Sequence, residues 1–149
     1  MPRNIDLPFR FNISLRIYSG KLPPAAVSKI LEIDATRLVA TEAQADDEGG
    51  TKFYIGKLNG WFLESEGRVE SRRPREHLDY FIRIIPQLSE RLPKVLAHEG
   101  ARADWNVVVW SEDGSDVLLT ATDLQALAAL NIPLNLSYRA YGDQTEVGE

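Results

Sequence analysis

The sequence predicts a two-layer α+β sandwich, in which helices cover one face of a mostly antiparallel sheet. Stretches of alternating apolar and polar residues, typical of half-buried strands, occur near both ends of the 149-residue chain. Between them, apolar residues recur every three or four positions, as in amphipathic helices. The expected order is β-α-β-β-α-β-α-β. Its first six elements match the split βαβ, or ferredoxin-like, topology, and a C-terminal helix and strand are added to this core.

The first strand is expected at residues 9–19. One side of it carries Phe9, Phe11, Ile13, Leu15 and Ile17, and the other carries Arg10, Asn12, Ser14, Arg16 and Tyr18. A short helix follows. Pro23 and Pro24 suit its first turn, where a missing N–H does no harm, and it should end near Ile33.

The middle of the chain is expected to add two strands. One lies within residues 35–43. Residues 52–65 then return as strand, interrupted by a bulge or tight turn at Gly56 or Asn59-Gly60, and the part at 61–65 is the second expected strand. Acidic residues and a glycine pair at 44–51 predict a flexible turn or a long hairpin loop.

The longest helix is expected to begin near Pro74 and to stop at Gly100. Its apolar stripe consists of Leu78, Phe81, Ile82, Ile85, Leu88, Leu92 and Val95. Pro86 and Pro93 lie inside this pattern, and each removes a backbone donor and clashes with the preceding turn. We therefore expect a kink or a break into successive segments.

The C-terminal part predicts a strand over residues 103–111, a turn at 112–115, a helix and a last strand. Thr122 and Gln125 have capping-box spacing, and Asn131 can end the helix. The last strand alternates, with Leu134, Leu136, Tyr138 and Ala140 on one side. The chain thus reads as one domain, residues 1–149, with a core at about 9–141 and an acidic tail at 142–149 that frays.

Composition excludes several kinds of chemistry. The chain has no cysteine, so disulfides, thiol nucleophiles and thiolate metal sites are ruled out. Its net charge of −5 argues against nucleic acid and anionic membranes as partners. His77 and His98 are 21 residues apart on one expected helix and cannot share a metal unless the helix folds back, so both read as surface residues. We expect no metal and no cofactor, and a cytoplasmic location because no signal peptide or membrane segment is evident.

The strongest candidate for a functional site is the polar face of the sheet. It would present Asn12, Arg16 and Tyr18 from the first strand, and Arg139 and Tyr141 from the last. The strand at 103–111 would add either Asn106, Val108 and Trp110 or Trp105, Val107 and Val109. Arg, Tyr and Trp contribute most of the energy in protein interfaces. The face therefore suits a partner, a small ligand or a second copy, although a plain solvated sheet face explains it equally well.

A second candidate is the arginine cluster of Arg68, Arg72, Arg73 and Arg75. Four arginines can bind phosphate or carboxylate groups, but the glutamates at 64, 66, 70 and 76 interleave with them. The segment is nearly neutral, and a solvated loop with mutual ion pairs is the favoured interpretation. No nucleophile motif, phosphate loop or convincing carboxylate pair stands out elsewhere.

Several segments, taken in order, resemble the bacterial family catalogued as domain of unknown function 4279. They are ISLRIYSGKLPPAAVSKILEIDATRLVATEA, GWFLES, HLDYFIRIIPQL and LTATDLQALAALNIPLNLSYRAY. Family members often carry a Pro-Thr pair and a Gly-Glu step where this chain has Ala35-Thr36 and Thr41-Glu42-Ala43. The resemblance implies a shared fold and makes Trp61 a landmark of that fold. It implies no reaction and no catalytic residues, and some small bacterial domains of this kind resemble immunity proteins of toxin systems.

These observations favour a non-enzymatic domain that binds a protein, with an immunity-type binder of a basic toxin as the concrete form. The alternative is a small-molecule binder or an unrecognised hydrolase that uses Arg16, Arg139, Tyr18 and a carboxylate on the polar face. A homo-oligomer is a further expectation for the same face.

Overall fold

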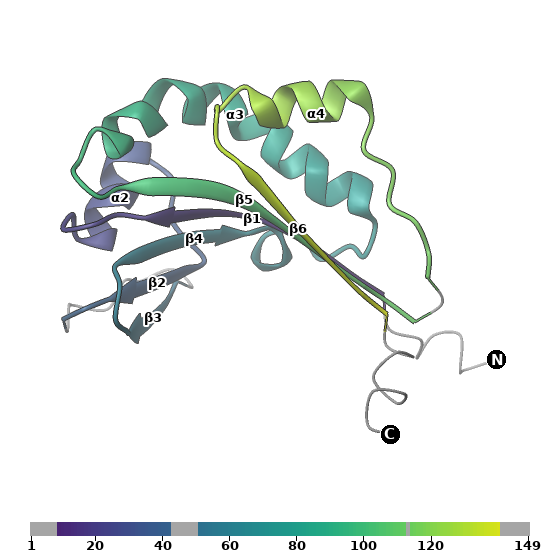
Figure 1. The fold of residues 1–149 in the computed structure, drawn as a ribbon, viewed down its shortest axis with the longest axis horizontal. Coiled ribbons are helices and arrows are strands. Elements are labelled where there is room, and N and C mark those ends of the chain that lie inside the picture. Colours follow the sequence, from purple (N-terminus) through teal and green to yellow (C-terminus); the bar gives the residue numbers. More distant parts are fainter. Residues whose placement is uncertain (1–8, 43–50, 113, 141–149) are drawn as a thin grey trace.

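The computed structural model describes residues 9–42, 51–112 and 114–140. Within these ranges, six strands form one sheet, and helices and one short 3₁₀ turn connect them (Figure 1). The strands are β1 (Phe9–Tyr18), β2 (Arg37–Ala40), β3 (Lys52–Ile55), β4 (Gly60–Glu64), β5 (Arg102–Ser111) and β6 (Leu134–Ala140). The helices are α2 (Pro24–Leu31), α3 (Pro74–Leu96) and α4 (Ala121–Ala128), and the 3₁₀ turn is η1 (Ser65–Gly67).

The strand order is β3-β2-β4-β1-β5-β6. The inner pairs β2/β4, β4/β1 and β1/β5 are antiparallel, and the outer pairs β2/β3 and β5/β6 are parallel. The sheet is therefore mixed, with most of its pairs antiparallel. The order β2-β4-β1-β5, with α2 after β1 and α3 after β4, is compatible with the expected split βαβ core. Helix α4 then connects β5 to β6 as the expected additional helix and strand, and this crossover allows the two strands to be parallel.

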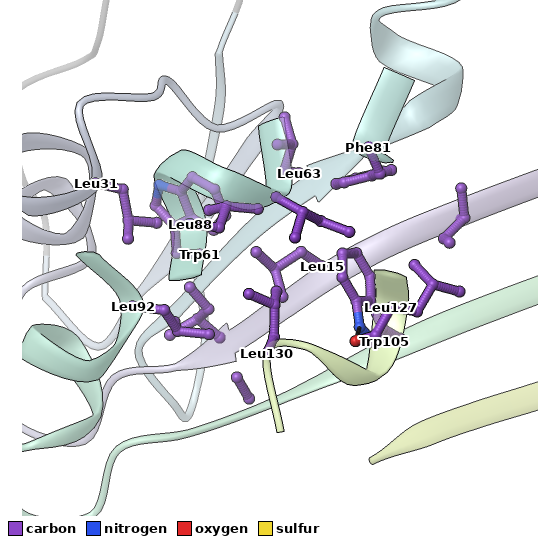
Figure 2. Packing of buried hydrophobic residues seen from close by; sticks show 14 of the residues in the cluster. Leu15, Leu31, Trp61, Leu63, Phe81, Leu88, Leu92, Trp105, Leu127 and Leu130 are labelled. Carbon is purple, nitrogen blue, oxygen red and sulfur yellow. Dashed lines mark hydrogen bonds between the residues drawn. The ribbon is translucent and has the colours of Figure 1, made fainter. Parts of the chain in front are cut away.

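The helices lie over one face of the sheet, and the core fills the space between the two layers (Figure 1, Figure 2). The apolar side of β1 faces the helices, as its alternation predicts. Trp61 and Trp105 are fully enclosed, and their indole N–H groups donate to Ser28 Oγ at 2.9 Å and to the Leu127 carbonyl at 3.0 Å. Both tryptophans thus tie a helix to the sheet without leaving a buried donor unpaired.

Of the flexible turn or long hairpin loop expected at residues 44–51, the hairpin alternative is wrong. Residues 44–50 lie outside the described part of the chain, but the strands on either side, β2 and β3, pair in parallel and so cannot be joined by a hairpin. Residues 52–65, expected to return as strand, form two strands: β3 at Lys52–Ile55 and β4 at Gly60–Glu64, where 61–65 was expected. Both lie beside β2. The composition of residues 44–51 does not encode the direction of the next strand.

Helix α3 does not break at its internal prolines. It runs from Pro74 to Leu96 as one element, and Figure 1 shows a single ribbon that changes direction along its length. Leu78, Phe81, Leu88 and Leu92 are buried on its core side, whereas Pro86 and Pro93 are exposed. Packing of this apolar stripe offsets the lost hydrogen bond at each proline, because burying one large side chain contributes about 1.5–3 kcal/mol.

The N-cap of helix α4 lies two residues before the expected one. Thr120, not Thr122, is the N-cap residue, and it forms a capping box with Asp123 instead of Gln125. The Thr120 hydroxyl accepts from the Asp123 N–H at 3.1 Å, and Asp123 Oδ2 accepts from the Thr120 N–H at 2.9 Å. The helix ends at Ala128, and Asn131 adopts the left-handed conformation just beyond it.

Candidate functional site

The polar face of the sheet gathers most of the predicted candidates on the side away from the helices. In the β1/β5 register, Asn12 faces Val108, Arg16 faces Asp104 and Arg10 faces Trp110. The strand β5 therefore contributes Asn106, Val108 and Trp110 to this face, while Trp105, Val107 and Val109 are buried in the core.

The last strand continues this face, since Arg139 of β6 lies opposite Trp110 in the register. It does not line the hollow described below, and it is an exposed residue at the end strand of the sheet. Tyr141 lies outside the described residues.

The polar face is hollowed at its centre. The hollow has a volume of about 350 Å³ and extends over β2, β4, β1 and β5. It is lined by Arg10, Asn12, Ser14, Arg16, Tyr18, Arg37, Phe62, Glu64, Glu66, Asn106, Val108 and Trp110. We call this feature the polar hollow. It brings Asn12, Arg16, Tyr18 and Trp110 of the predicted set together.

Each arginine of the polar hollow has a carboxylate partner. Arg16 forms two bonds to Asp104, at 2.7 and 2.8 Å, and these raise the pKa of the guanidinium. Arg10 likewise forms two bonds to Glu66, at 3.0 and 2.7 Å, and Arg37 lies 3.7 Å from Glu64. Bidentate pairs fix a guanidinium in place as well as neutralising it. The positive and negative charges of the hollow are therefore balanced and locally ordered.

Aromatic rings contact two of these arginines, Arg10 and Arg37, and a third arginine beside them. The Arg10 guanidinium lies 4.2 Å from the centre of the Trp110 ring, and Arg37 lies at the same distance from Phe62. Arg102, at the rim, lies 4.6 Å from the ring of Tyr18. Stacking on an aromatic face holds the planar guanidinium in a defined orientation. The hollow thus presents arginine and aromatic side chains whose positions are largely set before any partner arrives.

A buried network connects the polar hollow to helix α3. His77 is only 1% exposed, so its assignment as a surface residue is wrong, while His98 is exposed as expected. His77 Nε2 lies 2.6 Å from the Ser71 carbonyl, which can only accept, so this nitrogen carries the proton. His77 Nδ1 lies 2.7 Å from Ser65 Oγ. Ser65 Oγ also lies 3.2 Å from Asn12 Oδ1, which faces the hollow.

The contact between Ser65 and His77 does not make a nucleophile. Ser65 is fully buried, and its hydroxyl already accepts the Ile13 N–H at 3.0 Å. A serine that attacks a substrate must reach it, and this hydroxyl is enclosed beneath the sheet face. The network instead connects β1, η1 and α3, and it fixes the side chain of Asn12.

The arginine cluster at residues 68–75 is dispersed. Arg68 donates to the Asp34 carbonyl at 2.9 Å, and Arg75 binds Asp123 through two bonds, at 2.9 and 2.7 Å. Arg72 and Arg73 are exposed, and Arg73 makes only a 4.0 Å contact with Glu76. The four guanidinium groups therefore point to different parts of the fold instead of converging on one ligand site.

Within residues 9–42, 51–112 and 114–140, the structure contains neither a metal-binding cluster nor a membrane-spanning helix. No group of three His, Asp or Glu side chains is placed to hold a metal ion. No helix in the part of the chain that the structure describes is long and apolar enough to cross a membrane.

About half of the residues that line the polar hollow were not predicted as site residues. Arg37, Phe62 and Glu64 come from β2 and β4, whose neighbours were not known, and Arg10 and Glu66 were not singled out as site residues. The signal for Arg10 was present, since it continues the alternation of Asn12, Ser14 and Arg16. Glu64 and Glu66 were expected to pair with the arginines at 68–75, whereas they pair with Arg37 and Arg10.

The fold and this site define a small α+β domain with an open sheet face that is polar and aromatic. The sequence matches the family described as Domain of unknown function (DUF4279) over residues 9–141, and the chain belongs to that family. No curated protein and no solved structure matches the chain.

Proposed function

We propose that this protein is a non-enzymatic binding domain that holds a partner protein in the polar hollow. The observation that carries the proposal is the gathering of Arg16, Tyr18 and Trp110 in one concave surface. Arginine, tyrosine and tryptophan dominate the energetics of protein interfaces. Because carboxylates and rings already hold the arginines, binding requires little further ordering of side chains.

The charge balance of the polar hollow suggests what it recognises. Its arginines are neutralised by Asp104, Glu64 and Glu66, so it offers both donors and acceptors and no strong field of one sign. A partner segment with mixed polar and aromatic groups would complement it better than a uniformly charged one.

An immunity-type role is the concrete form of this proposal: a bacterial, cytoplasmic protein that binds and blocks a toxin. The net charge of −5 would steer a basic toxin toward the domain at long range, and the balanced hollow would provide the close contacts. A toxin recovered as the bound protein would support this form.

Site-directed photo-crosslinking tests the proposal. A photoreactive phenylalanine analogue replaces Asn106 in the polar hollow, and as a matched control it replaces the exposed Glu90 on α3. After illumination in lysate of the source cells, the Asn106 variant should give a discrete adduct with one protein that the Glu90 variant lacks. Identical adducts from both positions, or none from Asn106, would contradict binding at the hollow.

A small polar ligand is the second candidate. The volume of about 350 Å³ falls at the lower end of the range for small-molecule sites, roughly 300–1,000 Å³. A compound that raises the melting temperature of the wild-type protein but not of Tyr18→Ala would favour this candidate. A metabolite library that gives no such compound counts against it.

A further inference from the structure

We propose that strand β6 pairs antiparallel with β6 of a second copy of this chain, forming a two-fold symmetric dimer with one continuous sheet. This surface differs from the polar hollow and does not depend on the function proposed for it. Three observations lead to the proposal: an open strand edge, an exposed apolar row on that same strand, and a charge pattern that selects one pairing.

The backbone of β6 has an open edge. It is the end strand of the sheet formed by the described residues, and β5 is its one neighbour there. The Trp105 N–H donates to the Pro133 carbonyl at 2.8 Å, so residue 133 directs its backbone groups toward β5. With a period of two, residues 135, 137 and 139 do the same. The N–H and C=O groups of Leu134, Leu136 and Tyr138 therefore point outward, available to another strand.

The same three residues expose apolar side chains. Leu134, Leu136 and Tyr138 are 39%, 60% and 48% exposed, and they lie on the helix side of the sheet opposite Trp105, Val107 and Val109. Leu118, 80% exposed, lines an apolar groove of about 510 Å³ together with Leu136 and Tyr138. An apolar row next to an open edge is the arrangement that strand pairing between chains would bury.

Two-fold symmetry allows a pairing that uses the whole strand. β6 covers Leu134–Ala140, so its middle residue is Ser137, and antiparallel pairing about this residue aligns all of both strands. Leu136 then lies opposite Tyr138 of the second copy, and their outward N–H and C=O groups form a hydrogen-bonded pair. Their side chains are on the same face, so apolar groups meet apolar groups across the new seam.

Charge selects this orientation over a parallel one. Arg139 is the sole charged residue of β6. Parallel, in-register pairing would place the two Arg139 side chains next to each other, which is destabilising. Antiparallel pairing places Arg139 opposite Asn135 of the second copy instead.

The other edge of the sheet, β3, also exposes Tyr54 and Ile55, but it is shorter and carries a lysine. β3 has four residues and begins with Lys52, and short strands and lysines are common protections against pairing between chains. β6 has seven residues and contains neither lysine nor proline. The edge strand most open to a second copy is therefore β6.

The dimer would place both polar hollows on one side. The two-fold axis of an antiparallel edge pair stands perpendicular to the sheet, so each face continues onto the same face of the partner copy. Both helix layers would lie on the opposite side. A partner with two copies of its own binding segment would then be held more tightly than a monomer could hold it.

Cysteine crosslinking tests the register, since the natural chain has no cysteine. In Ser137→Cys, the two thiols lie opposite each other at a Cα separation of about 4.5 Å, within disulfide reach. In the matched control Asn135→Cys, they are roughly 14 Å apart along the strands, beyond reach. Rapid, nearly complete disulfide dimer is expected for Ser137→Cys alone. Equal or absent crosslinking in both variants would overturn the proposal.

The mass of the protein in solution provides the second measurement. Light scattering should give a dimer for the wild type and a monomer for Leu136→Lys, because a lysine there enters the apolar seam. Leu58→Lys is the matched control: Leu58 is 56% exposed and far from β6 in the sheet order, and its variant should remain dimeric. A monomeric wild type, or a dimer that Leu58→Lys abolishes and Leu136→Lys does not, would overturn the proposal. A chain that ends at Ala140 is a further control. If this chain dimerises and the full chain does not, residues 141–149 cover the edge of β6 in the full chain, and the proposal is overturned.

Discussion

Asp123 is a buried carboxylate whose partners come from two elements. It is 3% exposed, it accepts two bonds from Arg75 of α3, and it also accepts the Thr120 N–H. The Arg75 bonds are the main reason that the pKa of Asp123 falls from 3.8 to about 2. Arg75 also binds Asp79, at 3.0 Å, but that carboxylate is half exposed.

Replacing Asp123 should therefore cost far more than replacing Asp79. We expect Asp123→Asn to lower the free energy of unfolding by about 1–2 kcal/mol, a value reduced by the exposure of Arg75. Asp79→Asn should change it by less than about 0.5 kcal/mol. Urea denaturation at pH 7 measures both. Equal losses would show that the burial of Asp123 does not make the Arg75–Asp123 pair more stabilising than the Arg75–Asp79 pair.

The pKa of Asp123 also sets a pH dependence for the same pair. Because the pKa is lower in the folded state, the contribution is fully present above pH 3.8 and is lost as the pH falls toward 2. The stability difference between the wild type and Asp123→Asn should therefore shrink over that interval. A difference that stays constant down to pH 2 would contradict the assignment.

At the scale of the element, the start of α4 shows how a local motif can be placed wrongly. Thr120 and Thr122 are both followed three residues later by a residue that suits a capping box, Asp123 and Gln125. The structure uses the first, because Asp123 is also bound by Arg75 of α3. That contact joins residues 48 positions apart, and no local pattern reveals it.

The cap gives a matched pair of variants. Thr120→Ala should lower the free energy of unfolding by about 1 kcal/mol, because the Asp123 N–H loses the hydroxyl that accepts its hydrogen bond. Thr122→Ala should leave it nearly unchanged, since Thr122 is exposed within the first turn. Thermal or urea unfolding decides between the two. A larger loss of unfolding free energy for Thr122→Ala would show that Thr122 is the cap.

At the scale of the whole molecule, periodicity predicted more than connectivity. The alternation in β1 predicted both faces of the sheet, and the stripe of α3 predicted its core side. The parallel pairing of β3 with β2 and of β6 with β5 could not be predicted, because pairing depends on contacts between distant segments. Of the kink or break expected in α3, the break is wrong, because core packing outweighs the local penalty of Pro86 and Pro93.

The polar hollow shows the same division. The alternation of β1 predicts that Asn12, Arg16 and Tyr18 lie on the polar face. Trp110 is predicted there once the other side of β5 is known to face the core. Arg37, Phe62 and Glu64 enter only because β4 lies between β1 and β2. His77 was misplaced because the partner that makes its burial favourable, Ser65, lies in η1 and not on its own helix.

Binding of the partner in the polar hollow is tested most directly by substitutions in the hollow. The quantity to measure is the affinity of each variant for the protein captured by crosslinking at Asn106. Titration calorimetry should show that Tyr18→Ala and Trp110→Ala each weaken binding at least about tenfold, the loss of about 1.4 kcal/mol expected at an interface hot spot. Leu124→Ala, at a residue 48% exposed on α4, should bind as the wild type does. Unchanged affinity in both hollow variants, or an equal loss in Leu124→Ala, would contradict the account.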